Sequence, residues 1–454
     1  MALTNTYSKR QELTTRSRTD NPPGLTSTVT AEYSYDDESR LTQAVTDTGG
    51  LLGTDTETFT LDGVGNRTAH NKILGSWDYD ANNRLTEKGL LDKTTYAYDD
   101  AGSLSQKTRG GSSLNYGYDS QHRLVEVKDT SGNPIARYGY DPMDRRIWKE
   151  AYRNQDGAAL SQPTRSYYLY SDEGLIAESQ QSITHPLPVG EGWGEGQATT
   201  EPAITAQYGP RPNSQFGTGV LFVKAKNSNN TNTIAYYHHD HLGTPLQATD
   251  KQGNIVWSAQ YNVFGQASIT TPTPTFDKPT ISSDLRFPGQ VYDEETGLHY
   301  NWHRYYDPAL GRYVTADPVG LQGGINTYAY VNGNPVNAVD PTGLIKLPTD
   351  PSGLPPNWNP DPSHRDPNGE RWTNGTDVFD FHKGRPGMPG WRGKDHWHHN
   401  GGDDHLEPGD QCPTSDDPPV VNIPDQNFQI EPPPLPWWVI FLIPFPGNPV
   451  YGGF

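Results

Sequence analysis

Two aspartates in matching surroundings are the clearest candidates for chemistry in this sequence. They begin the segments Asp317-Pro-Val-Gly-Leu and Asp340-Pro-Thr-Gly-Leu. Two carboxyl groups held close together cannot both ionise cheaply, so one keeps a proton while the other can act as a base. Aspartic proteases divide the work in this way, with one carboxylate activating water and the other protonating the leaving amide. Because Asp-Pro also opens many turns, a structural role is the alternative.

A histidine-rich stretch near the C-terminus is the second candidate. His396 and His398 stand two apart, so a strand over Lys394–His398 would place both imidazoles on one face. Two groups that titrate near neutral pH suit acid–base cleavage of a phosphodiester, and His382 and Lys394 could take part. The cations expected to contact phosphate are Lys383, Arg385 and Arg392.

The same stretch leaves two alternatives open. A metal-dependent, HNH-like nuclease would use Asp395, His396 and either His399 or His405 as ligands of a divalent ion. A Trp/His-rich hairpin without chemistry is the other alternative. Of these three interpretations, we favour the metal-independent nuclease.

A further run of histidines, His238-His-Asp-His241, could suggest a metal site. Neighbouring residues on a strand point to opposite faces, so at most two of these histidines could converge on one ion. We therefore favour a structural role for this run.

The elements that position these residues are predicted to be short β-strands. Only 32% of the 454 residues are hydrophobic, which by itself would suggest disorder. Aromatic residues make up 11%, however, with 26 Tyr, whereas disordered chains are poor in aromatics. A chain rich in Tyr, Thr and Gly is typical of many strands joined by tight turns, so we predict an all-β fold.

Charge and cysteine content exclude several classes. The formal net charge of −19 argues against attraction of the whole chain to nucleic acid or to an anionic membrane. A single cysteine, Cys412, rules out an internal disulfide. Residues 1–10 have no apolar run, so no secretory signal is expected. The apolar segment Trp437–Phe445 is shorter than the roughly 20 residues that a membrane-spanning helix needs, so no stable membrane span is expected.

A repeated unit occupies the first third of the chain. Each copy has two aromatic or apolar residues two positions apart, then Asp, then a short turn that leads to Arg-Leu or a variant of it. Residues two apart share one face of a strand, and Asp starts a turn, so each copy predicts one hairpin. The repeat aspartates are Asp36, Asp62, Asp80, Asp99, Asp119 and Asp141.

These copies resemble the YD repeats of the RHS family, whose strands wind into a hollow shell. The segment from Phe287-Pro-Gly-Gln through Arg304-Tyr-Tyr-Asp-Pro to Leu344 is similar, almost residue for residue, to the RHS-associated core. The resemblance implies self-cleavage of the Leu344–Ile345 bond by Asp317 and Asp340, with Arg304 supporting a carboxylate. Residues after 344 look like a small toxin module, polymorphic toxin type 37, which is held to be a nuclease.

The sequence thus predicts a β-shell followed by a small α+β or β-rich toxin module. Its segments are 1–181 and 213–286 (YD-repeat shell), 182–212 (Gly/Pro-rich insertion or loop), 287–344 (core with the autoproteolytic site), 345–410 (toxin module) and 411–454 (Pro-rich acidic tail with an apolar end).

The resemblance implies a toxin carrier that encapsulates its C-terminal toxin and releases it by cutting after Leu344. We expect synthesis in the bacterial cytoplasm, export by a specialised (type VI-like) secretion system, and action in the cytoplasm of a competing cell. The expected partners are a cognate immunity protein, the secretion machinery or its adaptor, and nucleic acid, with RNA favoured. No cofactor is expected, unless the toxin module uses a divalent metal. The alternatives are a structural or cell-surface shell fragment without active toxin, and a membrane-active effector acting through the apolar C-terminus.

Overall fold

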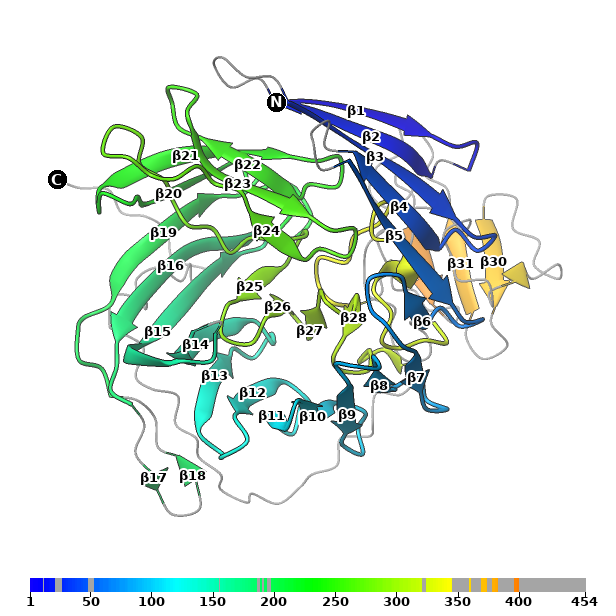
Figure 1. Cartoon of the computed structure of the whole chain (residues 1–454), viewed down its shortest axis with the longest axis horizontal. Helices are drawn as coiled ribbons and strands as arrows, with labels where there is room; N and C mark the ends of the chain where they lie inside the picture. The colour runs from blue at the N-terminus through cyan, green and yellow to red at the C-terminus, as the bar shows by residue number, and fades with distance from the viewer. Residues whose placement is uncertain are drawn as a thin grey trace. The chain divides into compact units, whose positions relative to one another are not determined.

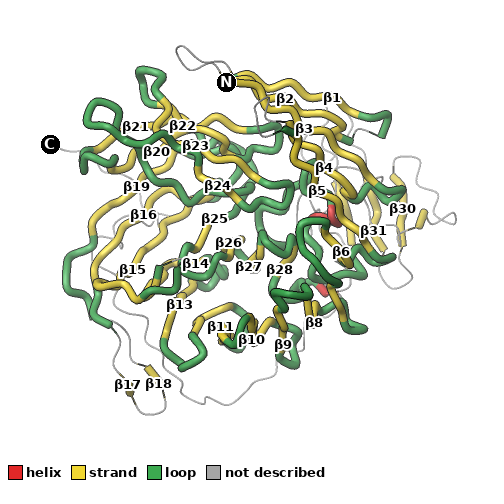
Figure 2. Tube along the Cα trace, viewed as in Figure 1, coloured by secondary structure: helices red, strands yellow, loops and turns green. Residues whose placement is uncertain are grey.

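The structure is a computed structural model of the chain. It describes residues 1–10, 12–20, 27–47, 53–154, 156–185, 188–189, 192–193, 197–320 and 324–344, and four short strands beyond residue 344. The chain forms two compact units, Met1–Pro413 and Thr414–Phe454, and the second lies outside the described residues. Strands and loops make up nearly all of what is described (Figure 2), so the all-β prediction is confirmed.

Six antiparallel strands at the N-terminus form the first sheet, in which neighbouring strands follow the order of the sequence (Figure 1). They are β1 (Ala2–Tyr7), β2 (Leu13–Asp20), β3 (Ser27–Tyr35), β4 (Leu41–Asp47), β5 (Thr54–Leu61) and β6 (Arg67–His70). Because every connection joins adjacent strands, this sheet is a simple meander of hairpins.

The second sheet contains 16 antiparallel strands, again in sequence order. They are β7 (Trp77–Tyr79), β8 (Leu85–Lys88), β9 (Thr94–Tyr98), β10 (Leu104–Arg109), β11 (Ser112–Tyr118), β12 (Leu124–Lys128), β13 (Pro134–Tyr140), β14 (Arg146–Arg153), β15 (Ala159–Ser171), β16 (Gly174–Ser182), β19 (Ala203–Gly209), β20 (Phe222–Lys226), β21 (Asn232–His239), β22 (Pro245–Thr249), β23 (Ile255–Tyr261) and β24 (Ala267–Ile269). A separate two-stranded hairpin, β17 (Pro188–Val189) with β18 (Gly192–Trp193), lies between β16 and β19 in the sequence.

The core segment forms a smaller four-stranded sheet that lies inside the bend of the second sheet (Figure 1). Its strands are β25 (Val291–Asp293), β26 (Leu298–Asn301), β27 (Arg304–Asp307) and β28 (Arg312–Tyr313), and a 3-10 turn, η2 (Val331–Gly333), follows. Every residue of β26, β27 and β28 is buried. The strands that carry the predicted site are therefore shielded from solvent.

Each repeat aspartate closes a hairpin, as the sequence predicts. In the first copy, Asp36 Oδ1 accepts the backbone N–H of Glu38 at 3.1 Å and of Arg40 at 2.8 Å, and Oδ2 accepts Arg40 Nε at 2.7 Å. Ser39, just before this arginine, has a left-handed φ of 60°. The turn also occurs outside the six copies of the first third, and there either Asp or Asn can begin it. Further aspartates and asparagines with the same pair of backbone bonds are Asp129, Asn154, Asn227, Asp240, Asp250 and Asn262.

Paired tyrosines tie several of the repeats to an earlier strand. The first tyrosine of a pair is buried, as at Tyr116 and Tyr138. The hydroxyl of the second donates to a backbone carbonyl, as from Tyr118 to Leu104 at 3.0 Å and from Tyr140 to Leu124 at 2.5 Å. Such bonds satisfy the polar end of a half-buried ring, so the repeated Tyr and Asp are architectural, as predicted.

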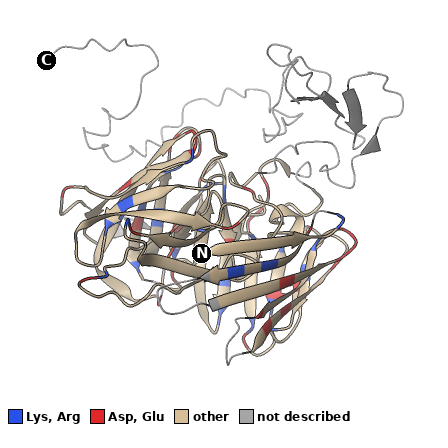
Figure 3. Cartoon of the chain, turned by 90° about the horizontal axis from the view of Figure 1, so that it is seen from above, with Lys and Arg blue, Asp and Glu red and all other residues tan. Residues whose placement is uncertain are grey.

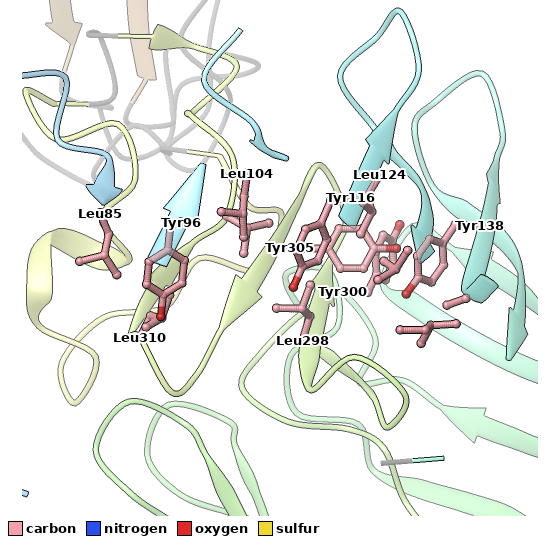
Figure 4. Packing of buried hydrophobic residues seen from close by; sticks show 14 of the residues in the cluster. Leu85, Tyr96, Leu104, Tyr116, Leu124, Tyr138, Leu298, Tyr300, Tyr305 and Leu310 are labelled. Atoms are coloured by element: carbon pink, nitrogen blue, oxygen red, sulfur yellow. The ribbon is translucent and has the colours of Figure 1, made fainter. Parts of the chain in front are cut away.

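The largest hydrophobic cluster joins the second sheet to the core segment (Figure 4). Leu104 and Tyr138 from the sheet pack with Leu298, Tyr300 and Tyr305 from β26 and β27. Beside this cluster lies a fully buried ion pair, in which Arg146 Nη1 is 2.5 Å from Asp293 Oδ2. Removing one partner of such a pair costs about 3–5 kcal/mol, so the core segment has one favoured position against the sheet.

The predicted boundary of the Gly/Pro-rich insertion is wrong at its C-terminal end. We assigned residues 182–212 to an insertion, but β19 pairs with both β16 and β20 within the second sheet. Its sequence, Ala203-Ile-Thr-Ala-Gln-Tyr-Gly209, has no repeat aspartate and therefore gave no signal. Between Ser182 and Ala203, the described residues include an isolated bridge of Ile183 with Ala198 and the separate β17–β18 hairpin.

Charges of both signs are spread along the strands (Figure 3), and many form ion pairs across neighbouring strands or within the turns. None of the described residues forms a helix with the length and apolar character needed to cross a membrane.

Candidate functional site

Arg304 lies between the two predicted aspartates. It begins β27, directly after the two-residue turn that joins β26 to β27, and its side chain is buried. Its Nη2 is 2.8 Å from Asp317 Oδ2 and 3.4 Å from Asp340 Oδ2. The three residues named by the sequence analysis are thus adjacent, although the two aspartates come from separate loops.

The orientation of Arg304 is held at each end of the guanidinium group. Nε donates to the carbonyl of Gly343, and Nη1 donates to the carbonyl of Thr327 at 3.1 Å. The guanidinium plane of Arg304 also lies over the ring of Tyr313, with Cζ 3.6 Å from the ring centroid. A lysine could supply the charge but could not make these contacts together.

Asp340 forms hydrogen bonds both to the predicted cleavage segment and to β28. Its Oδ1 accepts the backbone N–H of Leu344 at 3.0 Å, and its Oδ2 accepts the hydroxyl of Tyr313 at 2.6 Å. Asn301 Nδ2 donates both to the Tyr313 oxygen and to the Asp340 carbonyl, each at 2.8 Å. The sequence analysis missed Tyr313 and Asn301, because neither has a spacing that marks it as part of the site.

Asp317 both opens a turn and faces the site. Its Oδ1 accepts the N–H of Val319 at 3.1 Å, and its carbonyl accepts the N–H of Gly320 at 2.9 Å. Its Oδ2 remains directed toward Arg304. The turn interpretation and the chemical interpretation of Asp-Pro are therefore compatible here.

Burial raises the pKa of Asp317 and of Asp340 above the usual range of a carboxyl group, and Arg304 opposes this shift in both. The charge on Asp340 adds to the rise at Asp317. A carboxyl in a low-dielectric site beside a second carboxyl holds its proton more tightly. The pair can thus contain one protonated and one ionised group, which acid–base cleavage of an amide requires.

Residues 340–344 are held closely by the turn between β26 and β27. The backbone N–H of His303 donates to the carbonyl of Thr342 at 3.1 Å. Gly343 has a φ of +72°, and a Cβ there would collide with the backbone oxygen of Asn301. Leu344 is buried. Ile345, on the other side of the predicted scissile bond, lies outside the described residues.

The second predicted site lies on four short strands, β29 (Asn359–Pro360), β30 (Gly369–Thr373), β31 (Val378–His382) and β32 (His396–His399), paired in that order. His396 and His398 are indeed on one strand, and His382 pairs with His396 in the register. Asp380, which the sequence analysis did not name, pairs with His398. The other residues proposed for this site (Lys383, Arg385, Arg392, Lys394, Asp395 and His405) lie outside the described residues.

The run His238–His241 has structural partners. His238 Nε2 lies 2.9 Å from Thr249 Oγ1, and His241 Nε2 lies 2.9 Å from the carbonyl of Val336. Burial lowers the pKa of His239 to about 4. Asp240 opens a repeat turn and pairs with Arg16 at 3.3 Å. In the described part of the chain, no three His, Cys, Asp or Glu side chains gather as metal ligands.

Comparison with known proteins gives matches to two family models. Residues 4–161 match the Teneurin YD-shell model, and residues 234–268 match the RHS protein model. Both regions consist largely of the repeat hairpins described above. The two matches lie on either side of the Gly/Pro-rich stretch, which supports one architecture for the strands before and after it.

Curated relatives match a larger part of the chain. Double-stranded DNA deaminase toxin A of Burkholderia cenocepacia (strain H111) is 31% identical over 320 residues, which are 69% of this chain and 20% of that protein. The probable deoxyribonuclease RhsA of Dickeya dadantii (strain 3937) is 29% identical over 354 residues, which are 66% of this chain and 22% of that protein. The chain thus spans about a fifth of the length of these relatives.

Among solved structures, the crystal structure of TcdB2-TccC3-TEV matches 76% of this chain and 19% of that chain, with 18% identity and a TM-score of 0.38. The family matches agree with the repeat turns and the tyrosine pairs observed in the strands. The chain belongs to the RHS/YD-repeat proteins.

Proposed function

We propose that this chain is a toxin carrier that cuts its own backbone between Leu344 and Ile345 and so releases its C-terminal segment. The observation that carries the proposal is the position of Arg304, which contacts two buried carboxyl groups while one of them, Asp340, holds the N–H of Leu344. The catalytic groups and the residue before the scissile bond are therefore neighbours within one folded unit.

The proposed reaction is the hydrolysis of one amide. The ionised carboxylate takes a proton from water, and the water oxygen bonds to the carbonyl carbon of Leu344. The protonated carboxyl then gives its proton to the nitrogen of Ile345 as the carbon–nitrogen bond breaks. The products are a carboxyl group at Leu344 and a free amino group at Ile345, and one proton has moved between the aspartates.

The tether replaces a substrate pocket. Holding reactants in place within one molecule can supply an effective concentration of about 10⁵ M or more. Thr342 and Gly343 are held by the turn that also carries Arg304, so cleavage needs no separate binding step. Each chain would cut itself once.

For the released segment we propose a nuclease that acts on nucleic acid in a competing bacterium. Support comes from the printed names of the relatives, a deaminase toxin that acts on DNA and a probable deoxyribonuclease. The paired strands that bring His382 and His396 into register also suit acid–base chemistry. The proposal includes an immunity protein in the producing cell and export by a dedicated secretion system.

The experiment that tests self-cleavage is purification of the whole chain, followed by gel electrophoresis and N-terminal sequencing. The expected result is two fragments, the smaller of which begins at Ile345. Asp317→Asn and Asp340→Asn should each leave the chain whole. Asp307→Asn is the matched control, because Asp307 is buried on β27 and pairs with Lys107 at 3.0 Å, away from the site. A wild-type chain that folds but stays whole would contradict the proposal.

A further inference from the structure

A short chain of hydrogen bonds ends on Asp340. Asn301 Nδ2 lies 2.8 Å from the Tyr313 hydroxyl oxygen, which lies 2.6 Å from Asp340 Oδ2. The amide of Asn301 can only donate through this nitrogen, so the Tyr313 oxygen accepts there. The single hydroxyl proton of Tyr313 is then left to point at Asp340.

The orientation of the Asn301 amide is itself well determined. The same nitrogen also donates to the carbonyl of Asp340 at 2.8 Å. If the amide were turned over, its oxygen would face that carbonyl oxygen at hydrogen-bond distance without a proton between them, which is repulsive. The direction of donation therefore runs from Asn301 through Tyr313 to the carboxyl group.

Both oxygens of Asp340 consequently accept hydrogen bonds. Oδ1 accepts the N–H of Leu344 at 3.0 Å, Oδ2 accepts Tyr313, and Arg304 Nη2 is 3.4 Å from Oδ2. A protonated carboxyl would have to place its own hydrogen against one of these donors, whereas an ionised carboxylate accepts from all of them. Among the described residues, Asp317 accepts from Arg304 and from the N–H of Val319, and no tyrosine hydroxyl donates to it.

Building on the proposed self-cleavage, we propose that Tyr313, held by Asn301, is a positioning residue that keeps Asp340 ionised. Asp340 then supplies the base and Asp317 supplies the proton. Arg304 lies closer to Asp317, at 2.8 Å, and its N–H can still donate to the carbonyl oxygen of that carboxyl group when it is protonated. The hydroxyl of Tyr313 is thus the contact that separates the roles of the two aspartates.

The titratable groups that face Asp340 come from several elements of the core. Arg304 lies on β27, Tyr313 on β28 and Asp317 in the following loop, and the charge of Asp340 also acts on His303 and Tyr330. Burial lowers the pKa of His303 and raises that of Tyr330. Neither of these two side chains donates a hydrogen bond to the carboxylate of Asp340 among the contacts described, so Tyr313 can be tested separately.

The kinetic test compares Tyr313→Phe with wild type. The whole chain is pulse-labelled in a cell-free translation, synthesis is stopped, and cleavage is followed at set pH values from 5 to 8.5. The variant keeps the ring under Arg304 and loses only the hydroxyl. We expect the acid limb of the variant's pH–rate profile to move to higher pH by about one unit, because Asp340 loses a hydrogen-bond donor that favours its ionised form. Cleavage on that limb should fall about tenfold, while the rate at pH 8.5 stays within about twofold of wild type.

Tyr306→Phe is the matched control. Tyr306 is buried beside Tyr313, with ring centroids 5.8 Å apart, but its hydroxyl donates to the carbonyl of Phe264 at 2.7 Å. It should keep the wild-type pH profile. Equal slowing of Tyr313→Phe at every pH, or an unchanged profile, would overturn the proposal.

A second measurement does not depend on cleavage. On a chain kept whole by Asp317→Asn, adding Tyr313→Phe should lower the melting temperature at pH 7, and the difference should shrink toward pH 4 as Asp340 takes up a proton. A difference independent of pH would refute the role of Tyr313. If wild type never cleaves, the proposed function falls, and this comparison still decides whether Tyr313 holds a charged Asp340.

Discussion

Replacing Arg304 by lysine separates the charge of this residue from its shape. Lysine can place one ammonium group between Asp317 and Asp340, so the electrostatic part of the site survives. It cannot reach the carbonyls of Gly343 and Thr327 at the same time, since arginine uses Nε and Nη1 for these contacts. Each carbonyl left without a donor costs about 1–3 kcal/mol, so the folded chain should lose about 2–6 kcal/mol of stability.

The effect on cleavage should be larger than the charge alone would suggest. Gly343 precedes the residue that carries the scissile carbonyl, and a displacement of about 1 Å in such a segment can cost about 100-fold in rate. We therefore expect Arg304→Lys to cleave about 100-fold more slowly than wild type. Arg304→Gln, which also removes the only cation described between the carboxyl groups, should be slower still.

The assay is the same pulse–chase at pH 7, with a melting curve for each variant to show that it folds. Arg286→Lys is the control, because buried Arg286 donates to the carbonyls of Ser283 and Leu285 and lies over Tyr292, away from the aspartates. If folded Arg304→Lys cleaves at the wild-type rate, the contacts to Gly343 and Thr327 do not position the scissile segment. If Arg304→Gln cleaves as fast as Arg304→Lys, the charge is not needed.

Three further predictions concern other parts of the chain. Gly343→Ala should slow cleavage at least tenfold. Gly297→Ala should cleave normally, because its backbone is equally left-handed but no atom lies within 4 Å of a new Cβ. Equal cleavage rates of the two variants on a gel would contradict the close contact of Gly343 with Asn301. Burial raises the pKa of Glu178 from 4.5 to about 7, so stability is lost as pH rises between these values, by up to about 3 kcal/mol. Glu178→Gln should therefore melt higher than wild type at pH 8 and alike at pH 4; a gain that does not depend on pH would argue against the titration. Expressing the whole chain without a protective partner should stop bacterial growth. His396→Ala or His398→Ala should relieve this arrest, because losing one acid–base group lowers the cleavage rate by about 10²- to 10⁴-fold. Growth arrest that survives both changes would exclude the two-histidine mechanism.

The sequence predicted those features that local bonds determine. The repeat turn needs only Asp36 and the four residues after it, so its recurrence could be recognised from spacing. β19 was missed because its strand pairs depend on β16 and β20 rather than on its own residues. Asn301 and Tyr313 were missed for the same reason, since their contact with Asp340 arises only when three separate segments pack together.

The two candidate aspartates each share a side-chain hydrogen bond with the repeat turn, and they differ from the repeat at Asp36 in the residue that follows four positions later. In the repeat at Asp36, Oδ1 accepts the N–H of the fourth residue after it, and Oδ2 is occupied by the side chain of that residue, Arg40. Asp340 makes the same Oδ1 bond to Leu344, but leucine has no group to occupy Oδ2. That oxygen therefore accepts Arg304 and Tyr313 from other strands.

The residue four positions after Asp317 is also a leucine, Leu321, and the Oδ2 of Asp317 likewise accepts Arg304. Arg40 thus keeps the carboxylate of Asp36 within its own hairpin, whereas a leucine at the fourth position has no polar group with which to do so. The same comparison explains why Asp-Pro-x-Gly-Leu marks the site. The Gly supplies the left-handed position that Ser39 occupies in the repeat, as the φ values of +64° at Gly320 and +72° at Gly343 show. The Leu leaves each carboxylate available to a guanidinium group that both can share.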